Sequence, residues 1–126
     1  MVQTDVSQLS AECNEWRQIL RNYRDEFQLS KKSLQEIFKR NPSKEQLLEV
    51  DHFDNQFHIQ LINIHDVKQF IKAHERKLEL ESSSTESISE ETYSEHEALL
   101  DQFLSLENTL QELRGEFKNF VSASSC

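Results

Sequence analysis

The sequence predicts an all-α protein, an elongated antiparallel three-helix bundle whose chain runs up, down and up again. Its 126 residues include one glycine and one proline, too few for the turns that many short strands would need. Hydrophobic residues recur at alternating steps of three and four in three separate segments. Such spacing is typical of helices that pack through coiled-coil-like seams. The length indicates a single domain.

The first predicted helix covers about residues 5–40. Its apolar stripe is interrupted once, at Ser30, and contains Val6, Leu9, Cys13, Trp16, Leu20, Tyr23, Phe27, Leu34 and Ile37. Pro42 lacks the amide N–H that would continue the helix, and it disfavours helical backbone at Asn41. The chain should therefore reverse tightly at these two residues.

The second predicted helix covers about residues 43–80. Ser43 and Gln46 match a capping box, although Asn41 could be the cap with Pro42 at the first helical position. The stripe of this helix contains Val50, Phe53, Phe57, Gln60, Ile64, Val67, Ile71, His74 and Leu78. Residues 81–87 contain no apolar side chain to bury and are predicted to form a polar loop.

The third predicted helix covers about residues 88–121. Ser87 and Glu90 fit the S-x-x-E capping pattern at its start. Its stripe contains Thr92, His96, Leu99, Phe103, Leu106, Leu110, Leu113, Phe117 and Phe120. Residues 122–126 lack large apolar side chains and are expected to fray.

The formal net charge is -9, and the acidic residues concentrate towards the end of the chain. Residues 81–126 hold two Lys or Arg against ten Asp or Glu, whereas residues 1–41 hold seven against six. This acidic final part is either a solvated surface or a partner for the more basic first part. An acidic chain without a basic stripe is not expected to bind nucleic acid or an anionic membrane.

The expected location is the cytoplasm. No stretch of about 18 apolar residues is present, and the segment from Met1 to Ser10 lacks the pattern of a secretory signal. Cys13 and Cys126 lie near opposite ends of the sequence without the spacing of a zinc motif. They are therefore expected to be reduced thiols.

Four large hydrophobic residues of the second helix fall opposite its core stripe when residues are placed at about 100° per position. They are Leu48, Ile59, Ile62 and Phe70. Either the bundle wraps this helix more fully, or the side chains are simply exposed, or they form a partner face. Because two-fold homodimers are the commonest closed assemblies, we expect a homodimer, with another helical protein as the alternative partner. The predicted function is that of a non-enzymatic, self-associating scaffold or adaptor.

A second hypothesis concerns the segment His65-Asp66-Val67-Lys68. It resembles the phosphoacceptor stretch of histidine phosphotransfer and histidine-kinase dimerisation helices. The resemblance implies a phosphorelay module with His65 as acceptor, Asp66 as orienting acid and Lys68 as phosphate-neutralising cation. The first pattern has Gly where this chain has Gln69, and the second has Pro where it has Phe70.

A third hypothesis is a metal-binding bundle. Glu49-x-x-His52, with Asp51 beside it, matches one half of the carboxylate–histidine pattern of di-metal bundles. His74 and His96 occupy seam positions near one end of the predicted bundle and could meet in its core, more simply as a satisfied polar pair than as ligands. The sequence shows no nucleophile–base arrangement and no glycine-rich phosphate loop. We therefore expect no enzymatic activity, no cofactor and no metal.

Overall fold

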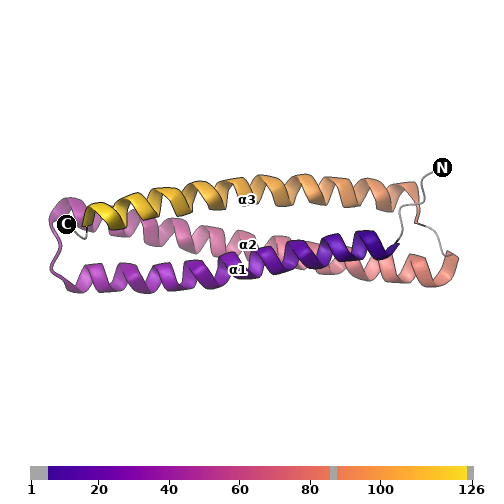
Figure 1. The fold of residues 1–126 in the computed structure, drawn as a ribbon, viewed down its shortest axis with the longest axis horizontal. Helices are drawn as coiled ribbons and strands as arrows, with labels where there is room; N and C mark the ends of the chain where they lie inside the picture. Colours follow the sequence, from indigo (N-terminus) through magenta and orange to yellow (C-terminus); the bar gives the residue numbers. More distant parts are fainter. Residues whose placement is uncertain (1–5, 86–87, 125–126) are drawn as a thin grey trace.

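The computed structural model describes residues 6–85 and 88–124. These residues form three long helices, α1 (Val6–Lys39), α2 (Lys44–Thr85) and α3 (Glu90–Ser124). The helices lie side by side along one rod, with α2 antiparallel to α1 and α3 (Figure 1). α2 contacts both other helices, and no strand occurs among the described residues. The predicted all-α antiparallel bundle is confirmed.

The predicted stripes form the core of the rod. Trp16, Phe57 and Phe103, one from each helix, are all buried. The rings of Phe27 and Phe117 each lie 5.0 Å from the ring of Phe57, measured between centroids. Aromatic side chains bury large areas, so this cluster is a major source of the bundle's stability.

The turn between α1 and α2 follows the sequence prediction. Asn41 takes a positive φ of 55°, a left-handed conformation that Asn tolerates better than most residues. The backbone N–H of Ser43 donates to Gln46 Oε1 at 3.0 Å, and the N–H of Gln46 donates to Ser43 Oγ at 3.2 Å. This reciprocal pair is a capping box, so Ser43 caps α2.

The predicted loop is wrong for residues 81–85, which continue α2. The carboxylate of Glu81 accepts hydrogen bonds from the backbone N–H of Ser89, at 2.9 Å, and from the hydroxyl of Thr92. These hydrogen bonds join the end of α2 to the start of α3. The composition of residues 81–87 alone does not indicate them. Ser89 Oγ accepts the N–H of Thr92 at 3.1 Å and caps α3, whereas the predicted cap, Ser87, lies outside the described residues.

The expected frayed tail is also wrong for residues 122–124, which belong to α3. The last turns of α3 lie beside the turn between α1 and α2 (Figure 1), where the rings of Phe120 and Phe53 are 5.2 Å apart. This contact holds the end of the helix against the bundle. Residues 125–126 lie outside the described part of the chain.

The ion pairs between α1 and α3 do not match the alternative in which the acidic final part of the chain pairs with cations of the first part. Arg114 of α3 binds Glu26 of α1, and His96 of α3 contacts Glu12 of α1. In both pairs the acidic residue belongs to the first part of the chain. The acidic surface of α3 is thus not held by the cations of α1 in the described structure.

Candidate functional site

The four predicted partner-face residues lie on the surface of α2. Leu48, Ile59, Ile62 and Phe70 are between 39% and 67% exposed. At about 100° per residue they fall within about 80° of one another around the helix. With a rise of 1.5 Å per residue, the stripe from Leu48 to Phe70 is roughly 33 Å long. These four residues, here called the exposed stripe of α2, are aligned along one side of the helix, with His52, Asn55 and Asp66 between them.

The three residues of the phosphorelay hypothesis have different environments. His65 and Asp66 are exposed, whereas Lys68 is only 9% exposed. The three side chains make no hydrogen bond or ion pair with one another in the described structure. The exposed imidazole of His65 is thus not paired with Lys68, the cation of the phosphorelay hypothesis.

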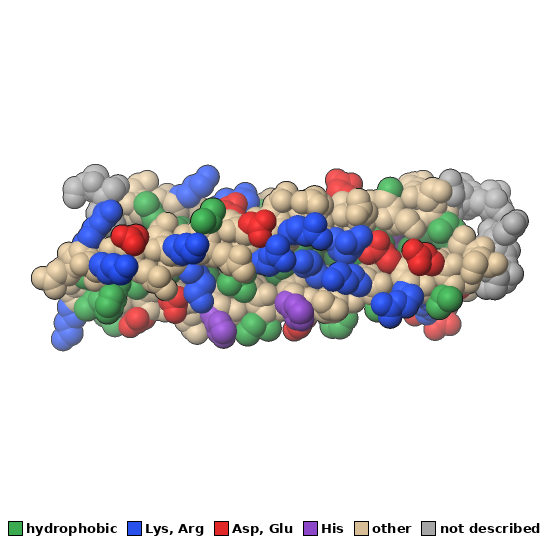
Figure 2. All heavy atoms as spheres, turned by 90° about the horizontal axis from the view of Figure 1, so that it is seen from below, with side chains coloured by type: hydrophobic (Ala, Val, Ile, Leu, Met, Phe, Trp, Pro, Cys, Tyr) green, Lys and Arg blue, Asp and Glu red, His purple; other side chains and the backbone are tan. Residues whose placement is uncertain are grey.

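Lys68 belongs instead to a cluster of positive side chains. Burial lowers its pKa, and the nearby charges of Arg24, Arg21, Lys72 and Arg17 lower it further. Figure 2 shows Lys and Arg side chains gathered near the middle of one long face of the bundle. The expectation of a surface without a basic stripe is therefore wrong at this position. The spacing of Arg17, Arg21 and Arg24, in steps of four and three, was the available signal.

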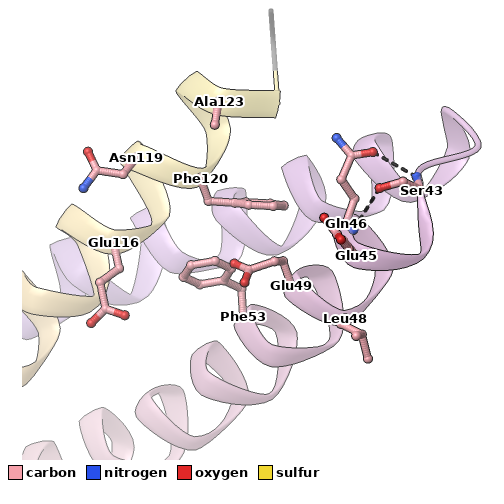
Figure 3. A pocket seen from close by; sticks show the side chains of 10 residues that line it. All are labelled: Ser43, Glu45, Gln46, Leu48, Glu49, Phe53, Glu116, Asn119, Phe120 and Ala123. Carbon is pink, nitrogen blue, oxygen red and sulfur yellow. Dashed lines mark hydrogen bonds between the residues drawn. The ribbon is translucent and has the colours of Figure 1, made fainter.

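Two grooves between α2 and α3 adjoin the exposed stripe. One lies at the end of the bundle near the turn between α1 and α2 (Figure 3). The side chains of Phe53 and Phe120 face each other in it, while Leu48 is directed away from them. The second groove includes Phe70 and His74 of α2 and Leu99 of α3. Leu48 and Phe70 are therefore each among the residues that border one of these grooves.

A buried polar cluster is the other candidate site, and each helix contributes one residue to it. Cys13 of α1, His74 of α2 and His96 of α3 are 0%, 6% and 3% exposed. His74 Nε2 lies 2.9 Å from His96 Nδ1, and Cys13 Sγ lies 3.9 Å from the same nitrogen. The prediction that the two histidines could meet in the core is confirmed.

The second ring nitrogen of His96, Nε2, contacts Glu12 of α1. His96 Nε2 lies 2.8 Å from Glu12 Oε1, and the ring of Trp16 lies 4.9 Å from the imidazole. Because a carboxylate can only accept, the neutral imidazole carries its proton on Nε2 and presents the Nδ1 lone pair to His74 and Cys13.

Burial controls the ionisation of the cluster. It raises the pKa of the Cys13 thiol to about 12, with further contributions from the negative charges of Glu75 and Glu12. Burial, followed by the neighbouring His96, lowers the pKa of His74. The free cluster therefore holds a neutral thiol and a neutral His74 at pH 7.

The donor atoms of the cluster lie within 4.8 Å of one another, so the group could bind one metal ion. Glu49, Asp51 and His52 form no comparable group in the described structure, and the ring of His52 contacts Phe53 instead. Cys13 could not be recognised as a candidate ligand from the sequence, because it occupies an ordinary position in the apolar stripe of the first helix. The sequence did carry one sign of this site: each of the three predicted stripes contains a possible metal ligand, namely Cys13, His74 and His96.

Comparison of the chain with models of protein families, with curated proteins and with solved structures finds no match. Its function must therefore be argued from its own residues. Within the part of the chain that the structure describes, none of the helices combines the length and the apolar character needed to cross a membrane.

Proposed function

We propose that this protein is a non-enzymatic scaffold or adaptor that self-associates through the exposed stripe of α2. The observation that carries the proposal is the alignment of Leu48, Ile59, Ile62 and Phe70 on one side of a helix whose other side is in the core. Large apolar side chains that are exposed along one side of a helix are a feature of protein interfaces. A second copy of the chain is the proposed occupant.

The stripe is suited to a two-fold contact, in which the same surface of both subunits must be self-complementary. If two copies of α2 pair antiparallel about Ile59, position 48 faces position 70 of the other copy. Leu48 then lies opposite Phe70, and Ile59 lies opposite its own counterpart. In the same register position 52 faces position 66, which places His52 near Asp66. Leu48, Phe70 and Ile59 thus meet apolar residues, Ile62 faces Gln56 of the other copy, and the acid of Asp66 meets the imidazole of His52.

Sedimentation velocity of the wild type against Ile62→Glu tests the proposal. Leu104→Glu is a matched control, because Leu104 on α3 is 49% exposed, as is Ile62, and lies outside the exposed stripe. We expect a dimer for the wild type and for Leu104→Glu, and a monomer for Ile62→Glu. A monomeric wild type, or a dimer that survives Ile62→Glu, would overturn the proposal.

The phosphorelay hypothesis is the alternative, and the exposure of His65 is the observation that favours it. A phosphoacceptor imidazole must be reached by the donor protein, which an exposed residue on a stable helix allows. Acid-labile phosphate on the wild type that disappears in His65→Gln would support this function. Labelling that persists in His65→Gln would exclude His65 as the acceptor.

A further inference from the structure

We propose that Cys13, His74 and His96 bind one zinc ion in the core of the bundle, with Glu12 orienting His96. This site is separate from the exposed stripe of α2. It would join all three helices through one ion, because each helix supplies one ligand. The role is structural, in that the ion would fix the helices against one another at this end of the rod.

The distances fit a tetrahedral ion with little rearrangement. Zinc bonds of about 2.3 Å to sulfur and about 2.05 Å to nitrogen place two nitrogen ligands about 3.4 Å apart and sulfur about 3.6 Å from nitrogen. In the structure the nitrogens of His74 and His96 are 2.9 Å apart, and Cys13 Sγ is 3.9 Å from His96 Nδ1. All three donor atoms lie within 4.8 Å of one another, so changes of up to about 1.2 Å in their separations would bring them to zinc-binding distances.

The donor chemistry also fits. Zinc binds thiolate and imidazole ligands, whereas calcium and magnesium bind oxygen ligands. The lone pair of His96 Nδ1 already faces the other two ligands, because Nε2–H is held by Glu12 Oε1 at 2.8 Å. A carboxylate that accepts the outer N–H of a ligating histidine is a common feature of zinc sites.

Charge and protons balance when the ion binds. Zinc replaces the thiol proton of Cys13, which is released to solvent, and the hydrogen bond between the histidines is exchanged for two zinc–nitrogen bonds. His74 then carries its proton on Nδ1. The two positive charges of zinc are offset by the Cys13 thiolate and the carboxylate of Glu12. Replacing one thiol proton by zinc therefore adds one positive charge, so that the cluster, counted with Glu12, changes from one negative charge to none, which limits the cost of burying an ion.

Access from solvent is provided by the groove between α2 and α3 that includes His74, Lys77 and Glu95. His74 therefore lies at the boundary between this groove and the buried cluster. A water molecule entering from the groove would supply the fourth ligand, since three protein ligands leave one tetrahedral position open.

Calorimetric titration of the full-length, chelator-treated protein with zinc tests the proposal, together with cobalt substitution. We expect binding of one ion per chain and, with cobalt, the visible bands of a tetrahedral ion with a thiolate-to-metal charge-transfer band. Cys13→Ser should remove the charge-transfer band and weaken zinc binding by more than the about 10- to 100-fold expected for Glu12→Gln, which removes only an outer contact.

Two controls separate this site from other ligands on the chain. Cys126→Ser leaves Cys13 as the single thiol, and His52→Gln removes an exposed histidine. Both should bind zinc as the wild type does. The proposal is overturned if the wild type binds no zinc, if the charge-transfer band survives Cys13→Ser, or if Cys126→Ser abolishes it. Should Cys13→Ser fail to fold, Glu12→Gln still decides, because its side chain is 37% exposed and unweakened binding would contradict the assignment.

Discussion

Arg114 of α3 donates two hydrogen bonds of 2.8 Å to the two carboxylate oxygens of Glu26 on α1. The same guanidinium lies 4.5 Å from the ring centroid of Tyr23, one turn earlier on α1. Arginine alone among the cationic side chains combines a planar fork for a carboxylate with a flat face for an aromatic ring. This contact therefore aligns α3 with α1 by geometry as well as by charge.

Replacing Arg114 with Ala should lower the free energy of unfolding by about 1–2 kcal/mol. The ion pair is partly exposed and contributes at most about 1 kcal/mol, and the contact with Tyr23 adds a comparable amount. Arg114→Lys should recover less than half of the loss, because lysine cannot form the two-pronged contact. Urea denaturation measures both variants, with Lys118→Ala as an exposed control. Equal stability of Arg114→Lys and wild type would show that charge alone matters.

Phe57→Ala should cost about 3–5 kcal/mol, the usual effect of removing a fully buried aromatic side chain. Phe57 is 0% exposed and contacts aromatic rings from both α1 and α3. Because small domains have about 5–15 kcal/mol of stability in total, much of the margin would be lost. Phe38→Ala, at a position 59% exposed, should change the unfolding free energy by less than about 0.5 kcal/mol. A loss of that small size for Phe57→Ala would contradict the packing described above.

Glu81→Gln should lower the melting temperature at pH 7, and the difference from wild type should vanish in acid. Hydrogen bonds from the Ser89 N–H and from the Thr92 hydroxyl lower the pKa of Glu81. A carboxyl whose pKa is lower in the folded state stabilises the fold fully above its unfolded value, and this stabilisation is lost as the pH falls through the folded value. The gap should therefore close as the pH falls below about 4.5.

Thermal melts between pH 3 and pH 7 measure this effect, with Glu79→Gln as an exposed control on the same helix. The control should melt as the wild type does at every pH. A gap for Glu81→Gln that stays constant down to pH 3 would show that its carboxylate is not the group that ties α2 to α3.

Lys68→Met should raise the free energy of unfolding at neutral pH by about 1 kcal/mol, since it removes a poorly solvated charge from among other cations. The pKa of Lys68 is lowered in the fold, so the folded state binds fewer protons than the unfolded state as the pH approaches 10. The wild type should therefore gain stability as the pH rises through this range, whereas Lys68→Met should not. Chemical denaturation at pH 7 and pH 9.5 measures both effects, with Lys32→Met as an exposed control. A less stable Lys68→Met would show that the ammonium group is favourably bound.

The features that depend on neighbours along the chain could be predicted from the sequence. The three seams follow from the helical repeat, and the cap at Ser43 follows from a pattern spanning four residues. Most contacts between helices could not be predicted in this way, although the meeting of His74 with His96 was. Residues 81–85 have no apolar side chain that would indicate a helix. The hydrogen bond from the Ser89 N–H to Glu81, which supports this part of α2, cannot be predicted from the composition of the segment.

By itself, the sequence determined the number of helices, their buried faces and the turn at Pro42, because helical periodicity and backbone restriction act over a few residues. Only the tertiary structure decided that Cys13 meets His74 and His96, and that the arginines of α1 surround Lys68. These contacts depend on how far each helix is shifted along the long axis of the bundle relative to its neighbours, which is the axial offset between the helices. That offset is set by how side chains interlock across the whole length of the rod, and the same heptad spacing would permit several offsets that differ by one turn.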